Sequence, residues 1–139
     1  MHKLKITDLS VGVWVRWNDK TYRVCLIDGV SLTVELAEEA GGTIEVAIDE
    51  LTGIPITPEI LEKNGFVGEI DEDNPVRTEY VSKAVNIVGF ADCDFYHCRI
   101  LHSEGWGRVL FPKIHYVHEL QHAIRLAGIE KEIELCFSN

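Results

Sequence analysis

The sequence predicts an α+β fold, in which a small antiparallel β-barrel is followed by a mixed sheet with one long C-terminal helix. Three observations support this fold class. Four short runs of alternating apolar and polar residues, separated by turn signals, fill residues 13–48. Further strand-like runs follow at 79–111 and at 132–137. The longest helical pattern covers residues 113–127 and is closed by Gly128.

Turn signals separate the four N-terminal runs. Asn18-Asp19 and Gly41-Gly42 are two of these signals. Asp28-Gly29 is the strongest hairpin signal, and it predicts a tight turn with Gly29 at positive φ. Four short strands so closely spaced favour an SH3-like barrel, which we assign to residues 1–54.

A short helix is predicted in the helical connector, residues 55–66. Thr57 is a suitable N-cap, and Pro58 suits the first helical position. Gly65 suits the left-handed position just after a helix. Residues 67–139 then form the predicted α+β module.

Four strands are predicted in that module. They cover Glu79–Ala91, Phe95–His102, Arg108–Phe111 and Glu132–Phe137. Pro112 is expected to end the third of them, because proline cannot donate a ladder hydrogen bond.

The long helix, residues 113–127, has one apolar arc on a helical wheel. Leu120 and Ile124 lie in this arc and are expected in the core. Three histidines cluster almost opposite and are expected to face solvent: His115, His118 and His122.

Charge is spread unevenly along the 139 residues, whose net charge is −10. Residues 35–73 carry Lys63 as their single basic residue against twelve acidic ones. Such a segment repels the phosphates of nucleic acids and anionic membranes, so neither is an expected partner. Three interpretations remain: a solvated surface, a docking face for a basic partner, and a mimic of DNA charge.

The cellular location follows from what the sequence lacks. No window approaches the roughly 18 apolar residues that cross a bilayer. The start, Met1–Lys5, lacks the apolar stretch of a secretory signal. We therefore expect a cytoplasmic protein whose four cysteines are reduced: Cys25, Cys93, Cys98 and Cys136.

Three stretches carry a family resemblance. They are the opening Ile6–Val15, the segment Ile54–Phe66 (IPITPEILEKNGF), and His115–Gln121 (HYVHELQ) followed by LAG and EIEL. Together they resemble a family of short uncharacterised proteins from gut Bacteroidales bacteria and their phages or mobile elements. The resemblance implies this genetic context and no activity. In that family asparagine often stands at the position of His122, and the resemblance therefore argues against chemistry that needs this histidine.

The segment 118–122 matches the zinc-binding pattern H-E-x-x-H. On a helix, His118 and His122 would share a face and could bind zinc, with Glu119 as general base. A third ligand is missing, since Arg125 and Gly128 stand where the extended pattern has glycine and histidine. We therefore predict no metal site, no cofactor and no catalytic residue. The alternative is a zinc-dependent metallohydrolase that uses His118, Glu119 and His122.

A second cluster has the spacing C-x4-C-x3-H. Cys93, Cys98 and His102 lack the close pair of cysteines and the fourth ligand of a zinc knuckle. A core position is therefore expected for Cys98. Two interpretations stay open for the three tryptophans, a place in the core or in the lining of a groove on the barrel: Trp14, Trp17 and Trp106.

These observations favour a non-enzymatic binding or accessory protein of phage or mobile-element origin. Its partner would be another protein, whose identity the sequence leaves open, as it does the oligomeric state. Two alternatives remain. One is the zinc hydrolase, and the other is an acidic decoy that binds a basic DNA-binding protein.

Overall fold

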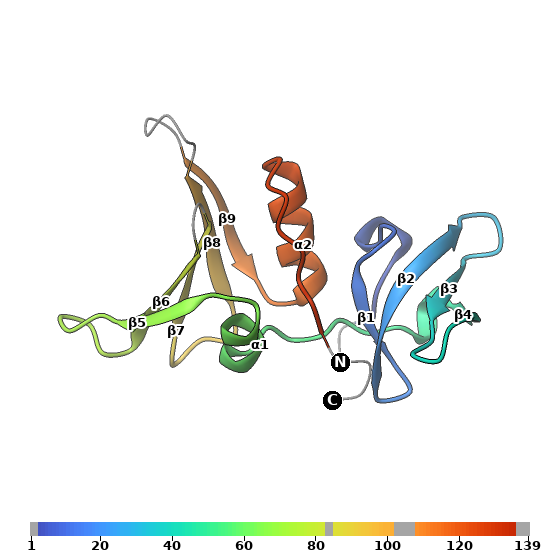
Figure 1. Cartoon of the computed structure of the whole chain (residues 1–139), viewed down its shortest axis with the longest axis horizontal. Coiled ribbons are helices and arrows are strands. Elements are labelled where there is room, and N and C mark those ends of the chain that lie inside the picture. Colours follow the sequence, from blue (N-terminus) through green and yellow to red (C-terminus); the bar gives the residue numbers. More distant parts are fainter. Residues whose placement is uncertain (1–2, 83–84, 102–107, 136–139) are drawn as a thin grey trace. The chain divides into compact units, whose positions relative to one another are not determined.

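The computed structural model describes residues 3–82, 85–101 and 108–135 (Figure 1). It contains two antiparallel sheets and a C-terminal helix, which confirms the α+β class. The chain divides into two compact units. The described parts of 1–55, 116–118 and 134–139 form the first unit, and those of 56–115 and 119–133 form the second.

The first unit is built on a four-stranded sheet in the order β1-β2-β3-β4. The strands are β1 (Trp14–Trp17), β2 (Lys20–Asp28), β3 (Thr33–Ala37) and β4 (Thr43–Ala47). Two short 3-10 helices flank them, η1 (Ile6–Asp8) and η2 (Ile48–Glu50). Within the described residues β1 and β4 form no ladder with each other, so this sheet is open.

The β1–β2 turn has the conformation predicted from the sequence, and the β2–β3 turn does not. Asn18 and Asp19 both have positive φ, 49° and 63°, as a two-residue hairpin turn requires. The prediction of a positive φ at Gly29 is wrong, and Leu32 takes the left-handed conformation instead, with φ of 56°. The reason is a longer connection than a two-residue turn, in which the Asp28 side chain accepts hydrogen bonds from two loop N–H groups.

The core of the first unit consists of aliphatic side chains from every element of the sheet. Alternation along β3 and β4 directs Val34, Leu36 and Val46 inward. The N-terminal segment and the chain after η2 complete this core with Leu4 and Leu51.

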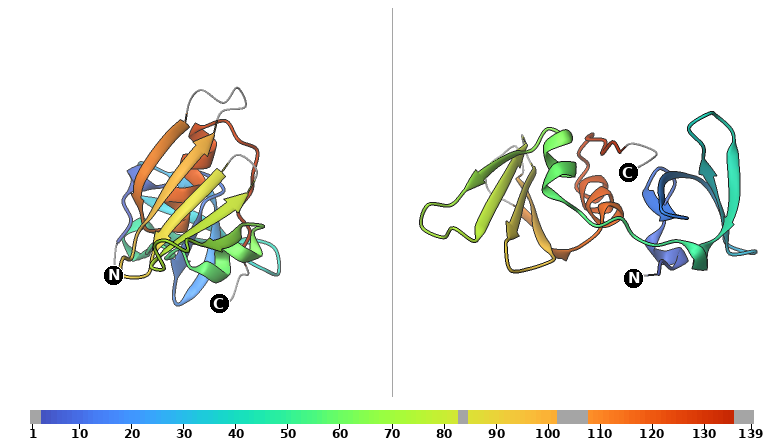
Figure 2. Two further views of the ribbon diagram at one scale, coloured as in Figure 1. Left: turned by 90° about the vertical axis from the view of Figure 1, so that its left-hand side faces the viewer. Right: turned by 90° about the horizontal axis from the view of Figure 1, so that it is seen from below.

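The second unit begins with helix α1 (Pro58–Lys63), as predicted. Thr57 caps it, because its hydroxyl accepts a hydrogen bond from the backbone N–H of Ile60 at 3.2 Å. Gly65 follows with φ of 87°, the left-handed geometry that ends a helix. Figure 2 shows α1 beside β5, at one end of the second sheet.

The second sheet has the strand order β5-β6-β7-β8-β9. Its strands are β5 (Val67–Ile70), β6 (Arg77–Ser82), β7 (Val85–Phe90), β8 (Tyr96–Leu101) and β9 (Arg108–Ile114). Every neighbouring pair is antiparallel, so the prediction of a mixed sheet is wrong. The connections explain this, because parallel neighbours need a long crossover and consecutive strands here pair directly.

Three predicted strands need correction. The run Glu79–Ala91 is two strands, since Ser82 already pairs with Val85 in the β6–β7 hairpin. Pro112 does not end β9, which continues to Ile114, because β9 lies at the edge of the sheet. Residues 131–135 form no strand, and the rest of the predicted strand lies outside the described residues.

Helix α2 (Val117–Leu126) starts four residues later than the pattern indicated, because the preceding residues belong to β9 and its exit. Leu120 and Ile124 are fully buried, as predicted. Gly128 has φ of 74° and donates its N–H to the carbonyl of Arg125 at 2.9 Å, which closes the helix.

Candidate functional site

His118 is buried, and only 2% of its surface is exposed. The prediction that all three histidines of the helix face solvent is therefore wrong. The Tyr116 ring explains the difference, since it stacks on the His118 ring at 5.7 Å with an interplanar angle of 11°. Stacking on an aromatic neighbour lets imidazole take a core position that a polarity pattern assigns to solvent.

Glu119, which follows His118 directly, and His122, one turn of α2 further on, complete the H-E-x-x-H match. The Oε1 atom of Glu119 accepts a hydrogen bond from the backbone N–H of His115 at 3.0 Å. The carboxylate thus satisfies an N–H group just before the helix. His122 is half-buried. Within residues 3–82, 85–101 and 108–135, no three His, Cys, Asp or Glu side chains gather where a metal ion could be held.

The second predicted cluster is split between core and surface. Cys98 is completely buried on β8, as predicted, and burial raises the pKa of its thiol to about 11. Cys93 is exposed in the β7–β8 connection, where desolvation and the neighbouring Asp92 raise the pKa of its thiol. His102 lies outside the described residues. In the absence of a metal, both environments therefore favour the protonated thiol.

The structure separates the tryptophans. Trp14 is a core residue with 2% exposure, and the Arg23 guanidinium lies 5.3 Å from its ring centroid. Trp17 is half-buried at the end of β1, where its ring contacts that of Tyr22 at 5.8 Å. Trp106 lies outside the described residues.

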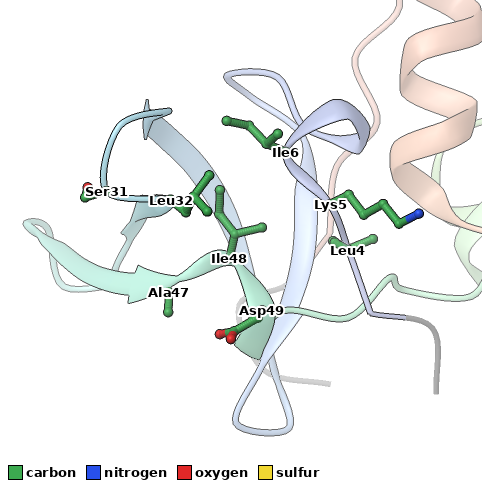
Figure 3. A pocket seen from close by; sticks show the side chains of 8 residues that line it. All are labelled: Leu4, Lys5, Ile6, Ser31, Leu32, Ala47, Ile48 and Asp49. Carbon is green, nitrogen blue, oxygen red and sulfur yellow. The ribbon is translucent and has the colours of Figure 1, made fainter.

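An apolar hollow of about 470 Å³ lies on the first unit (Figure 3). It belongs to η1, the β2–β3 loop and η2, and Figure 3 shows Ile6, Leu32 and Ile48 pointing toward one another. The amino group of Lys5 points away from them. The lining residues are Leu4, Lys5, Ile6, Ser31, Leu32, Ala47, Ile48 and Asp49. Its volume is in the range of small-ligand and side-chain pockets.

The N-terminal segment forms one wall of this hollow. The N–H of Leu4 donates to the carbonyl of Leu51 at 3.2 Å, and the N–H of Lys5 donates to the Asp8 carboxylate at 2.8 Å. These bonds hold η1 in place. Ile6 keeps 37% of its surface exposed, and its Cδ1 atom lies close to Gly29 in the opposite wall.

The β2–β3 loop forms the other wall. The Asp28 carboxylate accepts hydrogen bonds from the N–H groups of Val30 and Ser31 at 2.9 and 3.2 Å. The Ser31 hydroxyl and then these N–H groups lower the pKa of Asp28, so the loop holds its charged form. Leu32 follows at the left-handed φ of 56°, a strained conformation for leucine, with 54% of its surface exposed. Its carbonyl accepts the N–H of Ile48 at 3.0 Å, which fixes the loop to η2.

A second, more open hollow shares Asp49 with the apolar one. Its lining consists of Lys3, Trp17, Asn18, Asp49, Glu50 and Thr52. Two carboxylates, one amino group and one aromatic ring are thus part of its lining. In Figure 3 the Asp49 carboxylate points to the other side of η2 from the Ile48 side chain. The two hollows are thus neighbours of different chemistry, one apolar and one polar.

Sequence reasoning missed the residues of the apolar hollow. Ile6 and Leu32 are not part of any charged or metal-binding pattern, so no chemical motif singles them out. One signal was available. Val30 and Leu32 are aliphatic residues within a turn segment, where polar residues are the rule, and they are 98% and 54% exposed.

In the described part of the chain, no helix combines the length and apolar character that spanning a bilayer requires. Comparison with models of protein families, with curated proteins and with solved structures gives no match.

Proposed function

We propose that this chain is a non-enzymatic binding protein, and that the apolar hollow of its first unit binds a segment of a partner protein. One observation carries the proposal. Ile6 and Leu32 expose large apolar side chains toward a common hollow, and Leu32 does so in a strained backbone conformation. Strain of this kind concentrates at binding sites, because it persists only where the surroundings hold it.

The proposal extends to the architecture and the context. We propose that the four-stranded sheet with η1 and η2 belongs to the SH3-like class of barrels, since its short antiparallel strands share one aliphatic core. A phage or mobile-element context rests on the resemblance of Ile54–Phe66 and His115–Gln121, and a cytoplasmic location is proposed from the composition of the sequence.

The zinc hydrolase is the weaker proposal. A general base must be able to reach a water molecule, whereas the Glu119 carboxylate accepts the N–H of His115. His118 is engaged as well, by its stacking on Tyr116.

The experiment compares two variants of the β2–β3 loop in an affinity pull-down from a lysate of the organism that encodes the chain. Leu32→Asp removes the apolar side chain and suits the left-handed backbone, because aspartate tolerates positive φ better than leucine. Val30→Asp is the matched control, since Val30 is 98% exposed and does not line the hollow.

We expect the parent chain and Val30→Asp to retain the same partner and Leu32→Asp to lose it, with all three showing the same circular dichroism. Recovery of the same proteins by all three chains would show that the hollow is not the binding site. Loss of the partner with Val30→Asp alone would assign binding to the loop surface and would equally overturn the proposal.

A further inference from the structure

We infer that the partner segment carries an aliphatic side chain next to a cationic one, so that the first fills the apolar hollow and the second enters the neighbouring polar hollow. This inference rests on the proposed function and names the chemistry of the partner. Asp49 lines both hollows, so adjacent side chains of one segment can reach them together.

The apolar hollow selects the aliphatic side chain. Ile6, Leu32 and Ile48 converge there (Figure 3), and none of them offers a hydrogen bond. The amino group of Lys5 and the carboxylate of Asp49 point away from these three side chains. A polar group inserted among them would lose its water without replacement, whereas an aliphatic group gains by burial.

The neighbouring hollow selects the cation. Asp49 and Glu50 supply two carboxylates against the single amino group of Lys3. Trp17 adds an indole ring, the aromatic side chain that attracts cations best. A guanidinium or ammonium group in this hollow would therefore have carboxylates and an aromatic ring among its neighbours.

The segment that leads into Asp49 and Glu50 is acidic as well. Residues 35–50 contain six acidic residues and no lysine or arginine. Glu35 and Glu45 lie directly opposite each other in the β3–β4 ladder, and like charges in this position repel. A basic partner would relieve this repulsion and would be steered to the surface, whereas an acidic one would be rejected.

The test uses three blocked hexapeptides and the full chain labelled with ¹⁵N. The probes are acetyl-Gly-Ser-Leu-Arg-Ser-Gly-amide and its two variants, with glutamate in place of arginine or serine in place of leucine. NMR titration follows the amide signals of Ile6, Leu32 and Ile48 and the indole signal of Trp17, which report the two hollows separately.

We expect the Leu-Arg peptide to move all four signals and to bind about tenfold more tightly than the Leu-Glu peptide. The Ser-Arg peptide should leave the signals of the apolar hollow unchanged. The preference for arginine should disappear in Asp49→Asn/Glu50→Gln. It should persist in Glu38→Gln/Glu39→Gln, the matched control, which removes the same charge from the exposed β3–β4 connection.

Two other outcomes separate the inference from the proposed function. Equal binding of the Leu-Arg and Leu-Glu peptides at the apolar hollow would overturn the cationic partner and leave the binding function intact. Absence of any shift at Ile6, Leu32 and Ile48 with either leucine peptide would overturn both. An arginine preference that Glu38→Gln/Glu39→Gln removes equally would show diffuse attraction and would also overturn the inference.

Discussion

Replacing Gly53 with alanine tests the contact that joins distant parts of the sequence within the first unit. Gly53 is buried, and the Tyr116 side chain lies against its Cα. A Cβ atom added to Gly53 would lie 2.6 Å from Cδ1 and 2.7 Å from Cγ of that ring. Nearby, the N–H of Val117 donates to the carbonyl of Ile54 at 2.8 Å, so the ring cannot withdraw without disturbing a backbone pair.

The magnitude follows from these distances. Carbon atoms in contact are normally about 3.5–4.0 Å apart, so the new methyl group overlaps the ring by about 1 Å. Overpacking of this kind costs about 1–3 kcal/mol. The φ angle of Gly53 lies outside the left-handed region, so alanine can adopt it. Alanine then stabilises the folded state by about 0.4–1 kcal/mol, because it lowers the conformational entropy of the unfolded chain. The net loss has limits of about 0 and 2.6 kcal/mol and centres on about 1 kcal/mol, which is a fall of about 3–4 °C in Tm for a chain of this size.

The assay is thermal and urea unfolding of a double-mutant cycle. In a Tyr116→Ala background the ring is gone, and Gly53→Ala should become neutral or slightly stabilising. Gly29→Ala is the matched control, because its added Cβ meets only Ile6 Cδ1, at an ordinary 3.4 Å. The reasoning is refuted if Gly53→Ala melts at or above the parent, or loses the same free energy with and without the Tyr116 ring.

Four further predictions concern packing, protonation, metal and nucleic acid. Leu120→Ala and Ile124→Ala should each lower the free energy of unfolding by about 2–5 kcal/mol, and parental unfolding curves for both would contradict the packing of α2. Burial raises the pKa of Cys98 to about 11, so the folded state holds this proton more tightly than the unfolded state does. The contribution of this thiol to the free energy of unfolding is fully present below the unfolded pKa near 9. It declines as pH rises, by about 1 kcal/mol between pH 8 and pH 10. Cys98→Val should reduce this decline, and an identical pH dependence in the variant would exclude the thiol as its source. Protein purified without a histidine tag should contain no stoichiometric zinc and should melt alike with and without a chelator. Near-stoichiometric zinc that disappears in His122→Asn would establish the metal alternative. Duplex DNA should not bind at moderate salt, because residues 35–73 repel phosphate, and a sub-micromolar gel shift would refute this.

Local patterns predicted the elements whose signals are local. Thr57 and Gly65 specify the two ends of α1 through a side-chain hydrogen bond and a left-handed φ, and both effects depend on neighbouring residues alone. The predictions failed where a contact between residues of different elements determines the local structure. Pro112 continues a strand because β9 happens to be an edge, which depends on the order of all five strands. His118 is buried because Tyr116 stacks on it, and helical periodicity carries no information on this.

The apolar hollow could not be predicted from the sequence for the same reason. Ile6, Leu32 and Ile48 come from three separate segments, and only the folded unit brings them together. The Asp28-Gly29 pair correctly indicated a reversal of the chain. It could not indicate that the left-handed residue would be a leucine, because that depends on the bond between its carbonyl and η2.

The first unit is discontinuous in the sequence, and this has a consequence for its synthesis. Arg23 lies over Trp14 and pairs with Glu134 at 3.8 Å, so one of its partners comes from a segment that follows the whole second sheet in the sequence. The hairpins of β1–β4 leave the ribosome well before Glu134, so this surface stays uncovered until the second sheet has also been made. Pulse proteolysis of ribosome-bound chains of increasing length would locate the point at which protection appears. The first unit is thus begun before the second unit and completed after it, which exposes it to chaperones during the interval.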